Sequence, residues 1–201
     1  MTKKQENEIF TAGNSRMNAC LNFSCFTDHG YIEGYRLSGD VLVQHVQDTG
    51  FDHDYLVYPI IFNFRHHFEL ILKKIIFDGS RLVGKKIDRE KVMHHSLLKL
   101  WPMARSIMTT VDERYPGNRK EYAKTENVLR QFSNIDPDSM SARYPQDKAG
   151  KPNLQGLTHI DLLRLRDRVN ETSEFLVDYS NWIMQNLQWK FEMESEWAGD
   201  Y

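Results

Sequence analysis

The chain has 201 residues, of which 40% are hydrophobic and 27% charged, as expected for a globular protein with one well-filled core. Because 28 acidic residues balance 26 basic ones, the chain has no global positive field, and any binding of nucleic acid has to come from a local basic patch. Two cysteines exclude a disulfide scaffold, and no signal-like or membrane-spanning apolar run is visible, so we expect a cytoplasmic protein.

The first part of the chain is polar and then rich in glycine. Residues 1–12 are expected to be a disordered start, and residues 13–201 to form a single helical domain. Between residues 14 and 39, Gly30, Gly34 and Gly39 predict turns and short elements. Ser38 suits the N-cap of a helix over residues 40–48, which Gly50 ends.

The next segment predicts a long central helix that starts at Asp52 or Asp54 and runs to about Phe77. Pro59 is compatible with such a helix only in its first turn or at a kink. Apolar residues fall on most sides of the helical wheel, which is typical of a helix buried in the centre of a bundle.

Two shorter helices and a long final one follow. They are expected over residues 94–112, where Pro102 predicts a kink or a late start, and over residues 119–132. Residues 134–156 contain three prolines, two glycines and no periodicity, which indicates a functional or disordered loop. Thr158 then caps a helix to about Phe191, whose apolar residues alternate three and four apart. These elements predict an all-α fold, a bundle of four to five helices with a long irregular loop before the final long helix.

The central helix carries a stripe of charged residues that is unusual for a buried helix. Arg65, Glu69 and Lys73 are four residues apart and therefore share one flank, with His66 beside them. Buried charges are costly unless they have partners. The stripe therefore indicates either an ion-pair ladder in the seam between two helices or the polar wall of a site.

If the stripe belongs to a site, aromatic side chains wall it. The expected walls are Phe62, Phe64 and Trp101. The remaining polar residues of the helix fall on another flank and are expected to be solvated; they are Asn63, His67 and Lys74.

Two phrases of the sequence together resemble a known family. Phe68-Glu69-Leu70-Ile71-Leu72-Lys73, followed after a linker by His95-Ser96-Leu97-Leu98-Lys99-Leu100, resembles the first helix pair of the HEPN superfamily, named for "higher eukaryotes and prokaryotes nucleotide-binding". The resemblance covers about residues 55–105, roughly a quarter of the chain. It implies a helical bundle in which the glutamate, the lysine and the histidine mark the fold.

The resemblance also implies an activity. Many members of the superfamily are metal-independent ribonucleases of toxin–antitoxin and phage-defence systems, and others are binding modules without catalysis. The ribonucleases carry Arg, four to six residues, then His near the start of a late helix, and act across a dimer; Arg neutralises the phosphate and His moves a proton. In this chain Arg89 and His94 have that spacing, but they lie in the connector before the second helix of the pair. The final helix has Arg164, Arg166 and Arg168 with no histidine after them.

A substitute set of site residues is therefore expected around the stripe. The expected catalytic residues are Arg65, His66 and His95, and the expected binding residues are Glu69, Lys73, Arg143 and Tyr144. His95 is expected to be buried and to face Glu69 across the helix interface, while Arg143 closes over the site from the long loop. The alternative for His95 is a helix N-cap packed on Trp101.

Metal and cofactor chemistry have weaker support in the sequence. Cys20, Cys25 and His29 are zinc-ligand types, but their spacing is unusual and no fourth ligand is near. No phosphate-binding glycine loop and no nucleophile elbow occur. We therefore expect no metal and no cofactor.

Two functions remain open. The first is a HEPN-like ribonuclease of a toxin or phage-defence system, with an Arg/His site. The second is a non-catalytic helical module that binds a nucleotide or a protein partner. The expected partners are RNA or a nucleotide, a second copy of the chain, or a protein such as an antitoxin, and no membrane. The polar stripe and the long loop favour the first function, and the near-neutral charge favours the second.

Overall fold

The computed structural model describes residues 9–13, 16–21, 27–112 and 119–199, and it forms a bundle of five α-helices over these residues. The helices are α1 (Thr27–Thr49), α2 (His53–Leu82), α3 (Leu97–Asp112), α4 (Arg119–Ile135) and α5 (Leu162–Gly199). A single 3-10 turn, η2 (Arg89–Lys91), lies between α2 and α3. The described residues contain no β-strand, only an isolated bridge between Gln146 and Pro152. The predicted all-α bundle, with an irregular segment at 136–161 before the final long helix, is confirmed.

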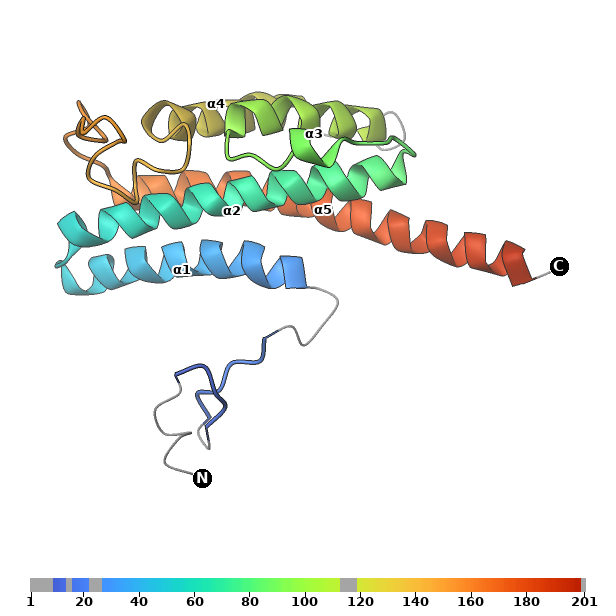
Figure 1. The fold of residues 1–201 in the computed structure, drawn as a ribbon, viewed down its shortest axis with the longest axis horizontal. Coiled ribbons are helices and arrows are strands. Elements are labelled where there is room, and N and C mark those ends of the chain that lie inside the picture. Colours follow the sequence, from blue (N-terminus) through green and yellow to red (C-terminus); the bar gives the residue numbers. More distant parts are fainter. Residues whose placement is uncertain (1–8, 14–15, 22–26, 113–118, 200–201) are drawn as a thin grey trace.

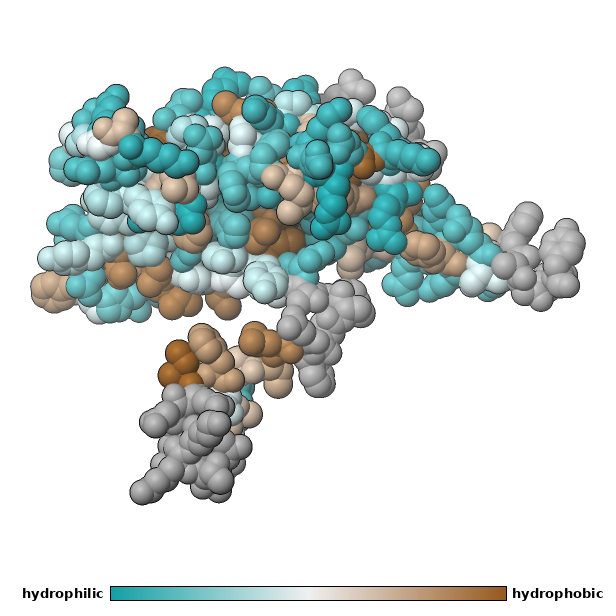
Figure 2. All heavy atoms as spheres, in the orientation of Figure 1, coloured by the Kyte–Doolittle hydropathy of each residue, from teal (hydrophilic) through white to brown (hydrophobic). Residues whose placement is uncertain are grey.

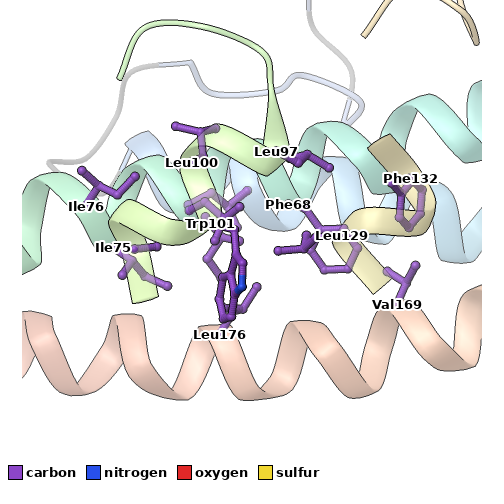
Figure 3. Packing of buried hydrophobic residues seen from close by; sticks show 14 of the residues in the cluster. Phe68, Ile75, Ile76, Leu97, Leu100, Trp101, Leu129, Phe132, Val169 and Leu176 are labelled. Carbon is purple, nitrogen blue, oxygen red and sulfur yellow. The ribbon is translucent and has the colours of Figure 1, made fainter. Parts of the chain in front are cut away.

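Helix α2 lies in the centre of the bundle and packs against α1, α3 and α5 (Figure 1). Its apolar side chains are buried on several sides, as the helical wheel predicts; they include Ile60, Ile61, Phe64, Phe68, Ile71, Leu72, Ile75 and Ile76. Figure 3 shows the core where side chains of four helices meet, among them Phe68, Leu100, Leu129 and Leu176. Each of these four side chains is fully removed from water. Burial of this apolar surface is the main force that holds the helices together.

The first helix is much longer than predicted. It spans Thr27–Thr49, whereas the sequence predicts turns up to residue 39 and a helix only from residue 40. Each glycine in a helix costs up to about 1 kcal/mol relative to alanine, but packing against α2 outweighs that cost. At residue 39 the packing even requires a glycine, because a Cβ atom there would lie 2.4 Å from Cε1 of Phe64. Residues 1–8 of the predicted disordered start lie outside the described residues.

Two helices begin later than predicted. Helix α3 starts at Leu97 rather than at residue 94, and Pro102 lies inside it, past the first turn, so the start is not set by the proline. Helix α5 starts at Leu162 rather than after Thr158, because Asp161 is the capping residue: its Oδ1 accepts the backbone N–H of Arg164 at 3.0 Å. The predicted seam of α5 is confirmed, since Val169, Leu176 and Ile183 are fully buried.

Hydrophobic side chains also remain on the surface. The last turns of α5 extend beyond the other helices (Figure 1), and Trp189 and Phe191 are exposed there. Along the edge formed by α1, where Leu37 and Val41 are exposed, hydrophobic residues gather on the visible face (Figure 2). None of the helices in the described part of the chain combines the length and apolar character needed to cross a membrane.

Candidate functional site

The charged stripe of α2 centres on the carboxylate of Glu69, which is 1% exposed. Its Oε1 accepts hydrogen bonds from Nζ of Lys73 at 2.7 Å and from Nδ1 of His95 at 2.9 Å. Its Oε2 lies 3.3 Å from Nη1 of Arg65 and 3.9 Å from Nδ1 of His66. We call these five residues the Glu69 cluster. Four of the five are consecutive members of the α2 stripe, and His95 comes from the segment before α3.

The surroundings of Glu69 keep it ionised. Burial raises the pKa of this carboxyl, but the hydrogen bond and charge of Lys73, together with His95, outweigh burial and hold the pKa below its ordinary value of 4.5. A buried carboxylate with this many donors is a satisfied one. Glu69 is thus a fixed negative charge that orients the cations around it.

Arg65 is completely buried and binds the backbone of two other segments. Its Nε donates to the carbonyl of Asp136 at 2.8 Å, and its Nη2 donates to the carbonyls of His95 at 2.6 Å and Pro137 at 3.2 Å. The guanidinium therefore ties α2 to the start of the 136–161 segment and to the residues before α3. Because no part of it is exposed, Arg65 holds the site together and presents no surface to a substrate phosphate.

Asp136 is the buried partner of Arg65 that the sequence analysis missed. Its Oδ1 accepts the backbone N–H groups of Met140 at 2.7 Å and Ser141 at 2.8 Å, which builds the first turn of the segment. Its Oδ2 lies 3.7 Å from Nε of Arg65. The available signal was an Asp-Pro pair directly after a helix, a common way to start a turn. Periodicity does not show that such an aspartate is buried.

The predicted contact between His95 and Glu69 is present, but the predicted burial of His95 is wrong. Its side chain is 59% exposed. The buried Arg65 binds only the backbone carbonyl of His95, and only one edge of the ring meets Glu69, so the rest of the ring reaches solvent. An ionised carboxylate can only accept hydrogen bonds, so Nδ1 of His95 carries a hydrogen and donates the hydrogen bond to Glu69. In the neutral ring Nε2 is then unprotonated and lies away from Glu69.

His66 lies between two aromatic rings rather than in a hydrogen-bond network. Its ring stacks on Phe62 with centroids 5.5 Å apart and meets the edge of Tyr35 at 4.4 Å. Its Nδ1 is buried and has no hydrogen-bond partner. Burial lowers the pKa of His66 below 6.5; Glu69 opposes this shift, and the charges of Lys73 and His95 add to it. His66 is therefore a neutral imidazole at neutral pH.

Arg143 and Tyr144 join the Glu69 cluster through Phe62. The guanidinium of Arg143 lies 5.4 Å from the ring centre of Phe62 and 5.7 Å from that of Tyr144, at cation–π distance. Its Nε donates to the carbonyl of Ser139 at 2.7 Å, which fixes its direction. Both Arg143 and Tyr144 are exposed, so the loop adds an accessible cation and an accessible ring to the site.

The opposite flank of α2 is not solvated, contrary to the prediction. His67 is fully buried, and its ring nitrogens lie 2.9 Å from the carbonyl of Ile32 and 2.9 Å from Oγ of Ser173. Asn63 donates to Oγ of Ser38 at 2.9 Å, and Lys74 pairs with Asp78 at 2.7 Å. The physical reason is that α1 and α5 cover this flank, which the wheel of α2 alone does not show.

Of the three expected aromatic walls, only Phe62 lies at the Glu69 cluster. Phe64 packs against α1 at Gly39. Trp101 lies near Tyr122 and donates to Glu126 of α4 at 3.4 Å, so it faces α4. The alternative for His95, an N-cap packed on Trp101, does not describe its contacts with Glu69 and Arg65.

The Arg89/His94 pair lies next to the cluster in the chain. The guanidinium of Arg89 lies 5.4 Å from the ring centre of Phe77, and Nδ1 of His94 accepts the backbone N–H of Ser96 at 3.2 Å. Burial and the charges of Lys99 and Lys73 lower the pKa of His94. The spacing implied by the resemblance also admits Arg89 with His95, with five residues between them, a match that the sequence analysis missed.

The structure brings no metal-ligand group together in the residues that it describes. Of the zinc-type residues considered in the sequence, Cys20 is exposed and Cys25 lies outside the described residues. No family model, curated protein or solved structure matches the chain. The fold and site by themselves define a helical-bundle protein with a buried carboxylate beneath an exposed histidine.

Proposed function

We propose that the chain cleaves RNA, with His95 as the residue that moves the proton and Glu69 as the residue that positions it. The observation that carries this proposal is the 2.9 Å contact between Nδ1 of His95 and the ionised Glu69, on a histidine whose side chain is 59% exposed. A buried carboxylate that fixes the tautomer of an exposed imidazole is an arrangement used for general base catalysis. The resemblance to the HEPN superfamily supports the same reading and suggests a role in a toxin or phage-defence system.

The chemistry follows from the position of the unprotonated nitrogen. Nε2 of His95 takes the proton of a 2′-hydroxyl, and the resulting oxygen attacks the neighbouring phosphorus. The bond from phosphorus to the 5′ oxygen breaks, and that oxygen receives a proton from water. The products are a 2′,3′-cyclic phosphate and a 5′-hydroxyl. Lys73 and the exposed Arg143 supply positive charge near the phosphate.

The local charge fits an anionic substrate although the chain as a whole is slightly acidic. Lys73, Arg143 and Lys99 lie around the histidines, and the charge of Glu69 is buried and compensated. The site is thus a local basic patch of the kind that a chain with net charge −2 needs in order to bind RNA.

The test is cleavage of a labelled single-stranded RNA by the purified protein, with the ends of the products identified. His95→Ala keeps the backbone carbonyl that Arg65 binds, and we expect it to lower the rate by a factor of about 10² or more while the melting temperature stays close to that of the wild type.

His45→Ala is a matched control for this test. His45 is also a half-exposed histidine beside a carboxylate, with its Nε2 3.0 Å from Asp52, but it lies outside the Glu69 cluster. We expect this variant to cleave at the wild-type rate. The proposal is wrong if the wild type leaves RNA intact, or if His95→Ala and His45→Ala cleave equally fast.

The burial of Arg65 favours a second candidate, a non-catalytic helical module that binds a nucleotide or a protein partner. In this reading the Glu69 cluster is structural, since its arginine is fully committed to the protein. Binding of RNA without cleavage, unchanged in His95→Ala, is the result that this candidate predicts.

A further inference from the structure

A groove of about 750 Å³ lies between the first turns of α2 and the irregular segment before α5. Figure 1 shows these two segments side by side at one end of the bundle. One wall is the first turns of α2 with Val57, Tyr58 and Ile61, and the other is the loop with Arg143 and Tyr144. A groove of this size suits a small organic group such as a nucleotide. It adjoins the Glu69 cluster and shares Arg143 with it, but Val57, Tyr58 and Tyr144 have no part in the proposed cleavage step.

The walls offer flat rings together with the cation Arg143, and the first turn of α2 adds the carboxylate of Asp54. Tyr58 is 49% exposed and Tyr144 is 50% exposed, so each wall presents an aromatic ring to whatever enters. Arg143 lies on the ring of Tyr144 and is itself exposed. On the α2 wall, the side chains of Val57 and Ile61 are apolar. Rings, an arginine and apolar side chains are the features that bind an unpaired base with its phosphate.

The groove is continuous with the Glu69 cluster. Arg143 lies on Tyr144 in the groove and also on Phe62, and Phe62 stacks on His66 of the cluster. Tyr58 and Glu69 are eleven residues apart on the same helix, which is about 16 Å along its axis. A short single strand that crosses this distance reaches both the groove and His95.

The loop wall is held in place by its own hydrogen bonds. Asn153 donates from its side chain to the carbonyl of Tyr144 at 2.9 Å, and its backbone N–H donates to the carbonyl of Pro145 at 2.9 Å. Oδ1 of Asp147 accepts the N–H groups of Ala149 at 2.8 Å and Lys151 at 2.9 Å. Tyr144 therefore stands on a fixed turn, and a fixed wall loses less entropy on binding.

We propose that this groove binds an unpaired base of an RNA strand that is cleaved at His95 a few nucleotides away, so that the protein acts on single-stranded RNA. This inference rests on the proposed function for the identity of the ligand. The base stacks on Tyr58 or Tyr144, and Arg143 meets the phosphate between the groove and the cluster. In a duplex the faces of the bases are already stacked, so double-stranded RNA does not enter the groove.

The test measures binding separately from cleavage, using the wild-type protein and a labelled 2′-O-methyl RNA of about ten nucleotides, a length that spans a single-strand site of this kind. This RNA lacks the attacking hydroxyl and cannot be cleaved by the proposed step. We expect tighter binding of the single strand than of its duplex in fluorescence anisotropy. Tyr58→Ala and Tyr144→Ala are each expected to weaken binding by a factor on the order of ten.

Tyr55→Ala is the control, because Tyr55 lies on the same helix, is 78% exposed and is not part of the groove wall. It is expected to bind like the wild type. The inference is overturned if single strand and duplex bind equally, if both groove variants bind like Tyr55→Ala, or if the wild type binds neither RNA.

Cleavage of ordinary RNA, measured in parallel, separates this inference from the proposed function. Tyrosine-dependent binding without cleavage by the wild type supports the groove and overturns the ribonuclease. Cleavage that depends on His95 but with unchanged binding in both tyrosine variants supports the ribonuclease and overturns the groove.

Discussion

The two flanks of α2 each bury a polar side chain, Glu69 on one and His67 on the other, and both side chains are almost completely removed from water. They differ in what their partners do. His67 is held between a backbone carbonyl of α1 and a hydroxyl of α5, both inside the bundle. Glu69 binds His95 and Lys73, whose side chains reach solvent.

This difference separates a structural polar contact from a candidate site. His67 is enclosed and its partners are two uncharged groups, which is the usual way to satisfy a buried polar side chain. On the Glu69 flank a buried charge orients an exposed imidazole, which is what proton transfer to a substrate needs. Burial of a polar residue therefore does not mark a site, whereas solvent access to its partner does.

The largest effect is expected from Arg65→Met. Arg65 supports the Glu69 flank from inside, and its removal leaves the carboxylates of Glu69 and Asp136 buried with fewer partners. Loss of one partner of a buried ion pair costs about 3–5 kcal/mol. Urea unfolding measures this loss as a lower midpoint.

Arg36→Met is the control for that measurement. Arg36 pairs with Glu33 and Asp40 on the surface of α1, with a side chain that is 28% exposed, so its loss is expected to cost less than about 1 kcal/mol. Equal losses in the two variants would contradict the structural role given to Arg65.

The next largest effect is expected from His67→Leu, and it tests the His67 flank through the pH dependence of the free energy of unfolding. Burial lowers the pKa of His67 below 6.5, with the carbonyl of Ile32 opposing the shift. Because the unfolded chain then binds more protons, His67 contributes stability that is fully present above about pH 6.5 and is lost as pH falls toward its lower folded pKa. His67→Leu is expected to cost about 1–3 kcal/mol at neutral pH and to remove part of this acid sensitivity.

Urea unfolding of His67→Leu and the wild type at a series of pH values between neutral and mildly acidic checks this prediction. His66 has a lowered pKa as well and contributes in the same direction, so His66→Leu is measured in parallel. If the free energy of unfolding of His67→Leu falls with pH as steeply as that of the wild type, His67 does not titrate in the way described.

A smaller effect is expected from Gly39→Ala, which tests how closely α1 covers the enclosed flank. The new Cβ would lie 2.4 Å from the buried ring of Phe64, which has to move. Overpacking costs about 1–3 kcal/mol, and the better helix propensity of alanine returns up to about 1 kcal/mol of it. Thermal unfolding of Gly39→Ala should therefore show a lower melting temperature than the wild type.

Gly34→Ala lies on the same helix with nothing within 4 Å of the new Cβ. It is expected to raise stability by about 0.5–1 kcal/mol. A destabilised Gly34→Ala together with a tolerated Gly39→Ala would mean that α1 packs differently from the arrangement described.

The contacts of the Glu69 flank could largely be predicted from the sequence, whereas those of the His67 flank could not. The 3–4 spacing shows α2 and α5, and the Glu69 flank follows from residues four apart on one helix. The His67 flank depends on Ile32 and Ser173, which are 35 and 106 residues away in the chain. Periodicity places a residue on a flank but does not show which helix covers that flank.

The same limit explains the other differences. Asp136 meets Arg65 across 71 residues and belongs to a segment without periodicity, so no local pattern predicts its burial. The start of α1 was missed because glycine argues locally against a helix, while the packing that outweighs it is tertiary. The irregular loop was predicted from composition, but the groove that it forms with α2 was not.

The smallest effect is expected from Lys73→Met. It distinguishes the two flanks, because Glu69 and His67 contribute to the free energy of unfolding in different pH ranges. Lys73 donates to Glu69 at 2.7 Å and is the main cause that holds the pKa of Glu69 below 4.5 against burial. Its side chain is 14% exposed, so the ion pair is partly screened and its loss is expected to cost about 1 kcal/mol at neutral pH.

Because the folded pKa of Glu69 is lowered, its contribution to stability is present above about pH 4.5 and is lost as pH falls through the folded pKa. Without Lys73 that pKa rises, so the free energies of unfolding of wild type and variant should converge below about pH 4.5, while the His67 dependence at higher pH stays unchanged. A difference that stays constant through the acid range would show that Lys73 packs against α2 without holding the charge of Glu69.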